Sequence, residues 1–447
     1  MVKLTRTIGR LCPIKVLVIG DLLLDAYTIG KARRISPEAP VAVVQVQQED
    51  YRPGGAGNVM LNLISLGAQV VSIGRVGKDW AGEKLCHALE HETIDTRFII
   101  KQENYQTPVK NRIIAENQQI VRVDHERMTN LPEPLEQQII DFLPEIVKDV
   151  KVIAISDYGK GFLTESLLSA LIGFAKVNNV IVIADPKGYD FSKYAGATIL
   201  KPNLSEAYIA AGLPMQACLQ YVSQKVLEIT QAEMLMITRS ECGISLFNKE
   251  GEQLDFPVQA REVKDVTGAG DTVLAMLTCA LANGLSYSEA ACLCNVAAGI
   301  AIEHMGCVRV TLSDLTYRLL EIDTSNKIFD KDHLFVLQEV LKNKPFNLLA
   351  FSSSEGFTPQ LFKVIKLLTQ EKKSALLIYL TDTEIEQSYI EMLTSLKEVD
   401  FLLLHPGSLT LLDPQESYLF ENGKLESLAP SFELLFLKEE SQFNSRI

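Results

Sequence analysis

Short apolar runs alternate with helical patterns along this 447-residue chain, and this alternation leaves few folds open to it. Residues 15–20 form a run of aliphatic side chains with the length of a buried strand. Comparable runs occupy residues 70–73, 152–155, 180–184 and 234–237, and residues 80–90 have helical spacing. Strands joined by helices form parallel sheets that are covered on both faces. The order therefore predicts an α/β protein with a doubly wound, mostly parallel sheet.

Two stretches of shorter pieces interrupt this order, at about residues 27–50 and 98–125. Apolar and polar residues alternate in them, as in strands with one solvated face, so we expect a small β lid beside the main sheet. A polar linker, residues 323–327, precedes further strand patterns. These patterns lie at residues 348–351, 376–380 and 401–404. The chain is thus predicted to hold a larger domain over residues 1–322 and a smaller, Rossmann-like α/β domain over residues 323–447.

The composition is that of a soluble globular protein, with 47% hydrophobic and 22% charged residues. A formal net charge of -13 and the lack of basic stripes argue against nucleic-acid binding, because phosphate backbones are bound by clustered Lys and Arg. The eight cysteines show no CxxC spacing, which favours a reducing compartment. No apolar run has the length of a signal peptide or a membrane span, so we expect a cytoplasmic protein that binds no membrane.

The segment with the clearest chemistry reads V-T-G-A-G-D and leads from a strand end into a helix. Gly268 and Gly270 lack a Cβ atom, so backbone N–H groups can approach an anion at the helix start, where the dipole is positive. Asp271 follows in the first turn, close enough to a bound phosphoryl group to accept a proton from an attacking hydroxyl. The segment therefore indicates a kinase. Close helix–strand packing, with Asp271 as an ordinary N-terminal carboxylate, would explain the same residues.

Polar residues near the first strand are candidates for binding a polyol. Asp21 and Asp25 lie at the carboxyl end of that strand, where open α/β sheets bind ligands, although turn aspartates that satisfy backbone N–H groups fit equally well. Gly54 and Gly55 allow a ligand to approach the backbone closely. Asn58, at the start of the next helix, offers a donor and an acceptor, and its alternative role is that of a cap.

Charged and polar groups further along suit phosphates. Asn203 and Glu206 are three residues apart and could face one phosphate or magnesium site. They also have the spacing of a capping box, and both roles can hold at once. Arg239 follows a strand and could meet nucleotide phosphates. The lid cations could meet a charged substrate or merely keep a strand edge soluble, and they are Lys31, Arg33, Arg34, Lys110 and Arg112.

The chain contains three motifs that resemble, in sequence and in order, those of the ribokinase (PfkB) family of carbohydrate kinases. They are GGAGN at residues 54–58, NLSE at residues 203–206 and VTGAGDT at residues 266–272. Other segments resemble one branch of that family, the heptose 7-phosphate kinase domain of the bifunctional ADP-heptose synthase. These segments are residues 19–25, 34–41, 52–55, 185–188 and 202–206. The resemblance runs from about residue 16 to residue 311.

The resemblance implies a ribokinase-like fold and an ATP-dependent kinase for D-glycero-β-D-manno-heptose 7-phosphate, on the route to ADP-heptose and the lipopolysaccharide core. Asp271 would be the general base for the anomeric hydroxyl. The amides of Gly268, Ala269 and Gly270 would stabilise the transferring phosphoryl group. The other implied contacts are Mg²⁺ and the ATP phosphates for Asn203 and Glu206, sugar hydroxyls for Asp21, Asp25, Gly54, Gly55 and Asn58, the nucleotide for Thr238, Arg239 and Asn295, and the substrate's own phosphate for Arg34, Lys110, Arg112 and Lys187. A monovalent cation is left open, and lid-to-lid pairing in the family implies a homodimer.

Two other functions stay open beside this one: a kinase of the same fold for another phosphosugar, and a non-catalytic sugar-phosphate-binding scaffold. Fold alone does not choose between sugars. Asp271, Asn203 and Glu206 together argue against the scaffold, because a protein that only binds a sugar needs no base.

The chain departs from that branch at two places. Residues 306–309 read Gly-Cys-Val-Arg where the branch has Gly-Thr-Ser-Thr, which leaves the nucleotide or cation contacts there in doubt. In the bifunctional enzyme the second half is a nucleotidyltransferase whose HxGH motif binds ATP phosphates, and the equivalent residues 358–361 here read Thr-Pro-Gln-Leu. Without imidazole donors this domain has no evident means to stabilise a leaving pyrophosphate, so we predict that adenylyl transfer is lost.

Overall fold

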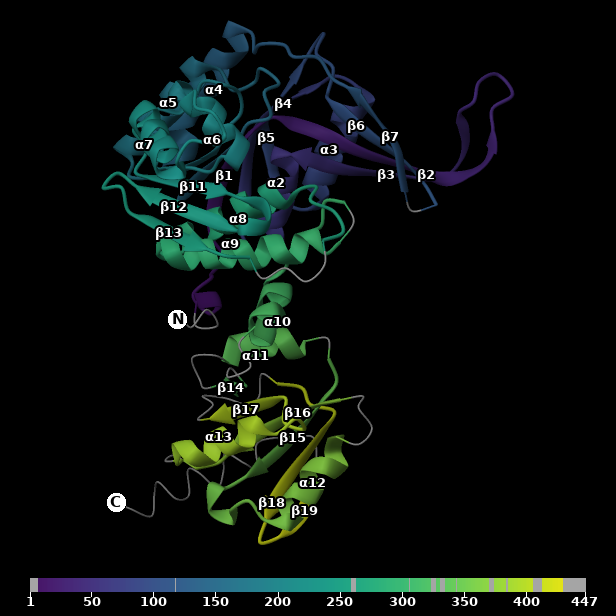
Figure 1. Ribbon diagram of the computed structural model, residues 1–447, viewed down its shortest axis with the longest axis vertical. Helices are drawn as coiled ribbons and strands as arrows, with labels where there is room; N and C mark the ends of the chain where they lie inside the picture. The colour runs from purple at the N-terminus through teal and green to yellow at the C-terminus, as the bar shows by residue number, and fades with distance from the viewer. Residues whose placement is uncertain are drawn as a thin grey trace. The chain divides into compact units, whose positions relative to one another are not determined.

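The computed structural model describes residues 7–116, 118–258, 263–304, 306–322, 327–329, 334–342, 344–369, 374–382, 385–404 and 412–428 (Figure 1). They form two compact units. The larger comprises Leu11–Thr311, and the smaller comprises the described residues of Met1–Arg10 and Leu312–Ile447. The division falls after Thr311 rather than after residue 322, because helix α10 (Leu312–Ile322) packs against a helix of the smaller unit. Among these residues, no helix combines the length and the apolar character that a membrane span requires.

The larger unit is built on a nine-stranded sheet, counted over the described residues, in the order β13-β12-β11-β10-β9-β8-β1-β4-β5. Its strands are β1 (Lys15–Gly20), β4 (Gln69–Gly77), β5 (Asp95–Gln102), β8 (Val152–Ser156), β9 (Ile181–Asp185), β10 (Ile199–Leu200), β11 (Met234–Thr238), β12 (Ile244–Asn248) and β13 (Gln253–Phe256). Only the β11–β12 and β12–β13 pairs are antiparallel. The doubly wound, mostly parallel sheet is therefore confirmed, and the carboxyl ends of β1, β8, β9, β10 and β11 share one edge.

Helices cover both faces of this sheet, as buried parallel strands require. They are α2 (Ala56–Ser65), α3 (Trp80–His91), α4 (Glu133–Val147), α5 (Glu165–Val177), α6 (Leu204–Ala211), α7 (Leu219–Thr230), α8 (Ala269–Ala282) and α9 (Tyr287–Ile302). Side chains of α4, α5 and α7 form one hydrophobic core with Leu17 and Ile19 of β1 and with Ile153 and Ile155 of β8. On the other face, α2 and α8 pack against each other and against β8. This second contact brings the start of α8 to the carboxyl end of the sheet.

A separate four-stranded sheet, in the order β3-β2-β6-β7, forms the lid that projects from the larger unit in Figure 1. Its strands are β2 (Leu22–Ile35), β3 (Ala42–Gly55), β6 (Val109–Ala115) and β7 (Gln118–His125). Residues 98–102, which we expected in the lid, instead belong to β5 of the main sheet, because their apolar side chains pair beside β4. The register places Asp25 opposite both Arg52 and Lys110, so these three side chains lie on one face of the lid sheet.

The smaller unit has a six-stranded sheet in its described residues, in the order β14-β17-β16-β15-β18-β19, with only β19 antiparallel. The strands are β14 (Ile328–Phe329), β15 (Phe346–Phe351), β16 (Ala375–Leu380), β17 (Phe401–Leu404), β18 (Glu416–Glu421) and β19 (Lys424–Leu428), and the helices besides α10 are α11 (Leu334–Leu341), α12 (Pro359–Thr369) and α13 (Gln387–Ser395). The strand patterns predicted at residues 348–351, 376–380 and 401–404 correspond to β15, β16 and β17. Most of the predicted linker, residues 323–326, lies outside the described residues.

Candidate active site

The V-T-G-A-G-D segment forms a tight turn into α8, as its glycines predict. Gly268 precedes the helix with a φ of 79°, a left-handed conformation that glycine adopts without strain. A Cβ atom there would also lie only 2.9 Å from Nδ2 of Asn58. The amide of Ala269 donates to the carbonyl of Val266 at 3.3 Å, whereas those of Gly268 and Gly270 donate to no described acceptor. The turn therefore keeps two backbone donors at the positive end of α8.

Asp271 does not cap its own helix, because its carboxylate bonds to side chains from two other elements. Oδ2 accepts from Nδ2 of Asn58 at 2.8 Å, and Oδ1 accepts from the hydroxyl of Tyr158 at 2.7 Å. The side chain is only 3% exposed. Burial raises the pKa of Asp271 to about 7, although the two hydrogen bonds favour the ionised form. A carboxyl group with that pKa is suited to accept a proton at neutral pH.

Asp21 fixes the loop that carries Tyr158. Its Oδ2 accepts from the backbone amide of Tyr158 at 2.9 Å and from that of Lys160 at 3.1 Å. Burial, with the nearby charge of Asp157, raises the pKa of Asp21 to about 6. Asp21 thus satisfies turn amides, the alternative that the sequence left open, and it thereby positions the tyrosine that contacts Asp271.

The lid contributes a buried ion pair to the same region. Nη1 of Arg112 lies 2.5 Å from Oδ1 of Asp25. Gly54 leaves room for that carboxylate, since a Cβ atom at this position would be 2.1 Å from Oδ2 of Asp25. Lys110 lies over the ring of Tyr158, with Nζ 5.5 Å from its centroid. Arg34 is different: it is exposed and far out on β2 opposite Val43, and no contact with a described residue brings it to this group.

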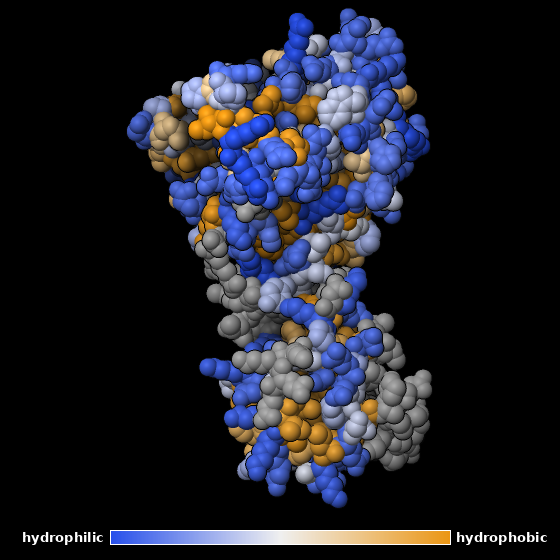
Figure 2. Space-filling view, turned by 90° about the vertical axis from the view of Figure 1, so that its right-hand side faces the viewer, coloured by the Kyte–Doolittle hydropathy of each residue, from blue (hydrophilic) through white to orange (hydrophobic). Residues whose placement is uncertain are grey.

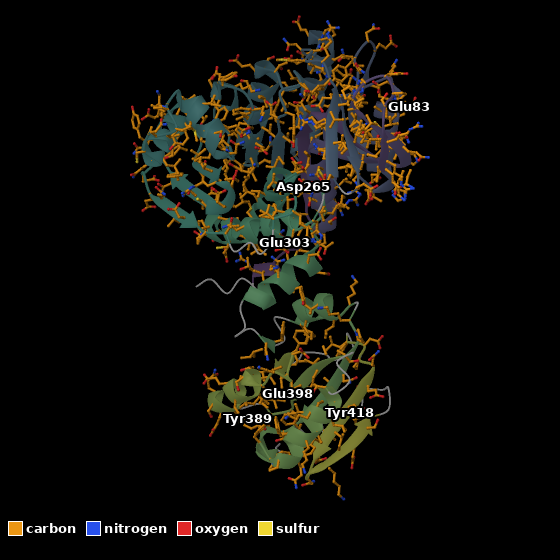
Figure 3. All side chains as sticks on the ribbon, turned by 45° about the vertical axis from the view of Figure 1, so that its right-hand side comes forward. Glu83, Asp265, Glu303, Tyr389, Glu398 and Tyr418 are labelled. Carbon is orange, nitrogen blue, oxygen red and sulfur yellow. The ribbon has the colours of Figure 1, made fainter. Side chains whose placement is uncertain are left out.

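Asp265, which precedes α8, ties the glycine turn to the segment that follows α9. Asp265, labelled in Figure 3, lies in the larger unit. It accepts from the amide and the hydroxyl of Thr267 at 2.9 and 2.7 Å, and from the amide of Gly306 at 2.8 Å. Cys307 consequently lies beside the turn, where its Sγ is 4.0 Å from Oδ2 of Asp25. Burial raises the pKa of the Cys307 thiol to about 12, so it remains a neutral wall of the site.

A second group gathers at the ends of β9, β10 and β11. Asn203 and Glu206 form the predicted capping box of α6, with bonds of 2.9 and 3.0 Å. Nζ of Lys187 is 2.7 Å from Oε1 of Glu206, so this lysine lies with the expected nucleotide contacts. Thr238 forms a β-bridge with Asn203.

Lys201 connects the two groups. It is 2% exposed and lies 2.9 Å from Oδ2 of Asp185. Its Nζ is 3.8 Å from the position that a Cβ atom on Gly270 would occupy. Burial raises the pKa of Asp185 to about 6 despite this lysine. A cation is thus held beside the glycine turn, where phosphoryl charge would lie.

The remaining expected nucleotide residues lie along the antiparallel strands. Nη1 of Arg239 donates to Oγ of Ser245 at 2.8 Å and to Oδ1 of Asp255 at 3.1 Å. Nδ2 of Asn295, on α9, donates to the carbonyl of Phe256 at 2.6 Å. Both side chains therefore hold strands β12 and β13 in place.

Sequence reasoning did not assign Tyr158 or Lys201. Each follows a buried strand, β8 and β10 respectively, and strand ends of this kind were the available signal. Their partners lie on other elements, Asp271 in α8 and Asp185 at the end of β9, so the sequence alone did not reveal the contacts.

Comparison with known proteins places this geometry in a family. Residues 13–314 match the pfkB family of carbohydrate kinases. The chain belongs to this family. It is therefore a carbohydrate kinase, a phosphotransferase with an alcohol group as acceptor.

Several similar curated proteins carry the name bifunctional protein HldE. The one from Trichlorobacter lovleyi is 46% identical over 336 residues, which cover 74% of this chain and 68% of that protein. The one from Geobacter sulfurreducens is 46% identical over 304 residues, which cover 68% of this chain and 62% of that protein. The match with the second relative thus spans less than two thirds of its length.

Solved structures agree on the fold. The ribokinase of Arabidopsis thaliana, solved with ribose and ATP, superposes with a TM-score of 0.54 at 19% identity and covers 69% of this chain and 99% of its own. Phosphofructokinase-2 of Escherichia coli, solved with fructose-6-phosphate, superposes with a TM-score of 0.56 at 19% identity, with the same two coverages. The larger unit is therefore ribokinase-like.

Proposed function

We propose that this chain transfers the γ-phosphoryl group of ATP to the anomeric hydroxyl of D-glycero-β-D-manno-heptose 7-phosphate. The observation that carries the proposal is the buried carboxyl of Asp271, with a pKa of about 7, beside the glycine turn at the start of α8. The choice of sugar rests on the segments shared with the heptose 7-phosphate kinase branch and on the 46% identity to proteins named bifunctional protein HldE.

In the proposed reaction Asp271 accepts the proton of the anomeric hydroxyl. The sugar oxygen bonds to the γ-phosphorus of ATP, and the bond from that phosphorus to the bridging oxygen breaks, so that ADP leaves. With a pKa of about 7, the Asp271 carboxyl is partly ionised at neutral pH and can then accept the proton. The amides of Gly268 and Gly270 and the ammonium of Lys201 lie where they would stabilise the transferred group.

Asn203 and Glu206 would hold Mg²⁺ together with the ATP phosphates. When bound, the ion would neutralise phosphate charge. Both carboxylate oxygens of Glu206 already accept one bond, from Lys187 and from the amide of Asn203, and each keeps a lone pair. Within the described residues, no three His, Cys, Asp or Glu side chains gather to hold a metal. Such a sparse donor set fits Mg²⁺, which proteins commonly bind through one or two carboxylates, waters and substrate phosphates.

The lid supports a homodimer. Its exposed apolar side chains include Ile35, Val41, Val46, Ile120 and Val121. Figure 2 looks at the side of the larger unit from which the lid projects, where hydrophobic residues lie among hydrophilic ones. A second copy of the lid would bury such side chains. Sedimentation equilibrium of the full chain measures this directly, and a monomer at all concentrations would contradict it.

The smaller unit is proposed to lack adenylyl transfer. Residues 358–361 lie at the start of α12, where Oγ1 of Thr358 accepts from the amide of Leu361 at 3.2 Å. The described residues of this unit include no histidine. The hydroxyl of Thr358 is uncharged and cannot neutralise the charge of a leaving pyrophosphate. Incubation of the full chain with heptose 1-phosphate and ATP should therefore release no pyrophosphate above background, and enzymatic release would overturn this part of the proposal.

A panel of sugar phosphates with coupled detection of ADP tests the kinase proposal. We expect the heptose 7-phosphate to give the highest kcat/KM, and Asp271→Asn to lose at least 10²-fold in kcat, about the contribution of a positioned base. Asp141→Asn, an exposed carboxylate on α4, is the matched control and should retain wild-type rates. Equal rates for wild type and Asp271→Asn would reject the mechanism. A different preferred phosphosugar would keep the mechanism and replace the substrate, and no turnover of any sugar would favour the scaffold.

A further inference from the structure

A cavity of about 630 Å³ in the larger unit is lined by two arginines and two histidines as well as by Asn58 and Cys307. Asn58 lines this cavity and also bonds to Asp271, so the cavity adjoins the reacting centre. Cys307, beside Asp25, lines it too. Its volume lies in the range of small-molecule sites.

Two arginines reach this cavity from different elements. Arg52 is opposite Asp25 in the lid register, so it extends from the lid face that carries the Asp25–Arg112 ion pair. Arg309 comes from the segment after α9, where this chain departs from the heptose kinase branch. The two side chains are 45% and 40% exposed, so both remain open to a ligand.

Each guanidinium is held in place by a carboxylate and keeps donors to spare. Arg52 lies 2.7 Å from Oδ2 of Asp50 and donates to the carbonyl of Cys307 at 3.4 Å. Nη1 of Arg309 lies 2.8 Å from Oε1 of Glu92. A guanidinium has five N–H donors in a fork that matches phosphate oxygens, so both can bind an anion without losing these carboxylates.

The opposite wall adds two imidazoles. His87 and His91 are one helical turn apart on α3 and both line the cavity. Each neutral imidazole carries one N–H donor. The carboxylates Asp50 and Glu92 face the same space and limit the affinity for anions, so the cavity suits a phosphate delivered on a sugar better than free phosphate.

Of the four cations that we expected to bind the substrate's phosphate, two lie away from Asp271. Lys187 is paired with Glu206 among the expected nucleotide contacts, and Arg34 is far out on the lid. The other two lie close to Asp271, at the reacting end of the sugar: Lys110 over the ring of Tyr158, which bonds to Asp271, and Arg112 paired with Asp25. A sugar with its anomeric hydroxyl at Asp271 would therefore extend its distal end toward the cavity of Arg52 and Arg309.

We propose that this cavity is the subsite for the phosphate that the sugar substrate already carries, bound by Arg52 and Arg309 with His87 and His91 as further donors. This inference rests on the proposed kinase function, and it adds the residues that select a phosphorylated sugar over a neutral one. Arg309 lies in residues 306–309, where the sequence differs from that of the heptose kinase branch. Its part of this selectivity would therefore be particular to this chain.

The test compares wild type with Arg309→Met, Arg52→Met and the charge-preserving Arg309→Lys. We expect each Met variant to raise KM about tenfold or more for the sugar phosphate, as for the loss of a charge-assisted hydrogen bond, and to leave kcat/KM for the same sugar without its phosphate nearly unchanged. Arg309→Lys should recover part of the loss. Arg97→Met is the matched control, because Arg97 is also an exposed arginine paired with a carboxylate, 2.6 Å from Asp95.

Equilibrium binding separates failure of the subsite from failure of the kinase proposal, since it needs no turnover. Titration calorimetry with inorganic phosphate and with the sugar phosphate should show weaker binding to both Met variants than to wild type and to Arg97→Met. If Arg52→Met fails to fold, the same binding measurement on Arg309→Met and His87→Gln tests the subsite. Both of these side chains are exposed, so their replacement should leave the fold intact. Unchanged phosphate binding in these variants, or equal losses for the phosphorylated and the neutral sugar, would overturn the subsite.

Discussion

Replacing Tyr158 with phenylalanine should move the acid limb of the kinase's pH profile to higher pH. The hydroxyl of Tyr158 donates to Oδ1 of Asp271 at 2.7 Å and favours the ionised carboxylate, against a burial effect that raises its pKa to about 7. A hydrogen bond to a charged group contributes about 1.5–3 kcal/mol. Since each pKa unit corresponds to 1.36 kcal/mol, its loss should raise the pKa of Asp271 by roughly one to two units.

The assay is kcat/KM for the sugar phosphate across the neutral range, which reports the ionisation of the free enzyme. Wild type should be near half-maximal at about pH 7 and near a tenth of its plateau one unit lower. The variant should reach half-maximum one to two units higher. Burial also raises the pKa values of Asp21 and Asp185, to about 6. The hydroxyl of Tyr158 bonds to neither of them. The hydrogen bond from the backbone amide of Tyr158 to Asp21 is unaffected by the substitution.

The pH profiles of wild type and Tyr158→Phe are compared with the same sugar phosphate. The ionisation of its phosphate therefore affects both profiles equally and cancels in the comparison. Tyr189→Phe is the control, because Tyr189 is 83% exposed and should leave the profile in place. A Tyr158→Phe enzyme with an unshifted midpoint and only a lower plateau would refute the reasoning: the tyrosine would then shape the site without setting the charge of Asp271.

Three further outcomes are expected. Gly54→Ala would place a Cβ atom 2.1 Å from Oδ2 of Asp25 and displace that carboxylate, so kcat/KM for the sugar should fall on the order of 10²-fold while KM for ATP is retained, as steady-state kinetics will show. Asp271→Asn should be more stable to urea than wild type at pH 8 by up to about 4 kcal/mol and nearly equal at pH 4. The raised pKa means that folded wild type binds the extra proton, and its stability falls as pH rises from about 4 to 7. Lys201→Met should lower the free energy of unfolding by roughly 3 kcal/mol above pH 6, because Asp185 then keeps an unpaired charge. Below pH 6, where the carboxyl of Asp185 is protonated, the loss should be smaller. Urea titrations that show the same loss at every pH would contradict this.

Local patterns predicted much of the larger unit. The apolar run at residues 15–20 coincides with β1, and the spacing of Asn203 and Glu206 did produce a capping box. The glycines before Asp271 produced a left-handed turn into α8. These features depend on neighbouring residues, where side-chain periodicity, backbone freedom and capping geometry act directly.

Contacts between distant segments were decided by the tertiary structure alone. Tyr158 meets Asp271 across 113 positions, and Asp25 meets Arg112 across 87. Lys187 is paired with Glu206, a contact that the sequence did not predict. The sequence by itself therefore determined which elements form and which carboxylate stands at the glycine turn. Only the packing of α2, α8 and the lid against the sheet decided which side chains surround that carboxylate and raise its pKa, because burial and pairing depend on what the whole chain brings together in space.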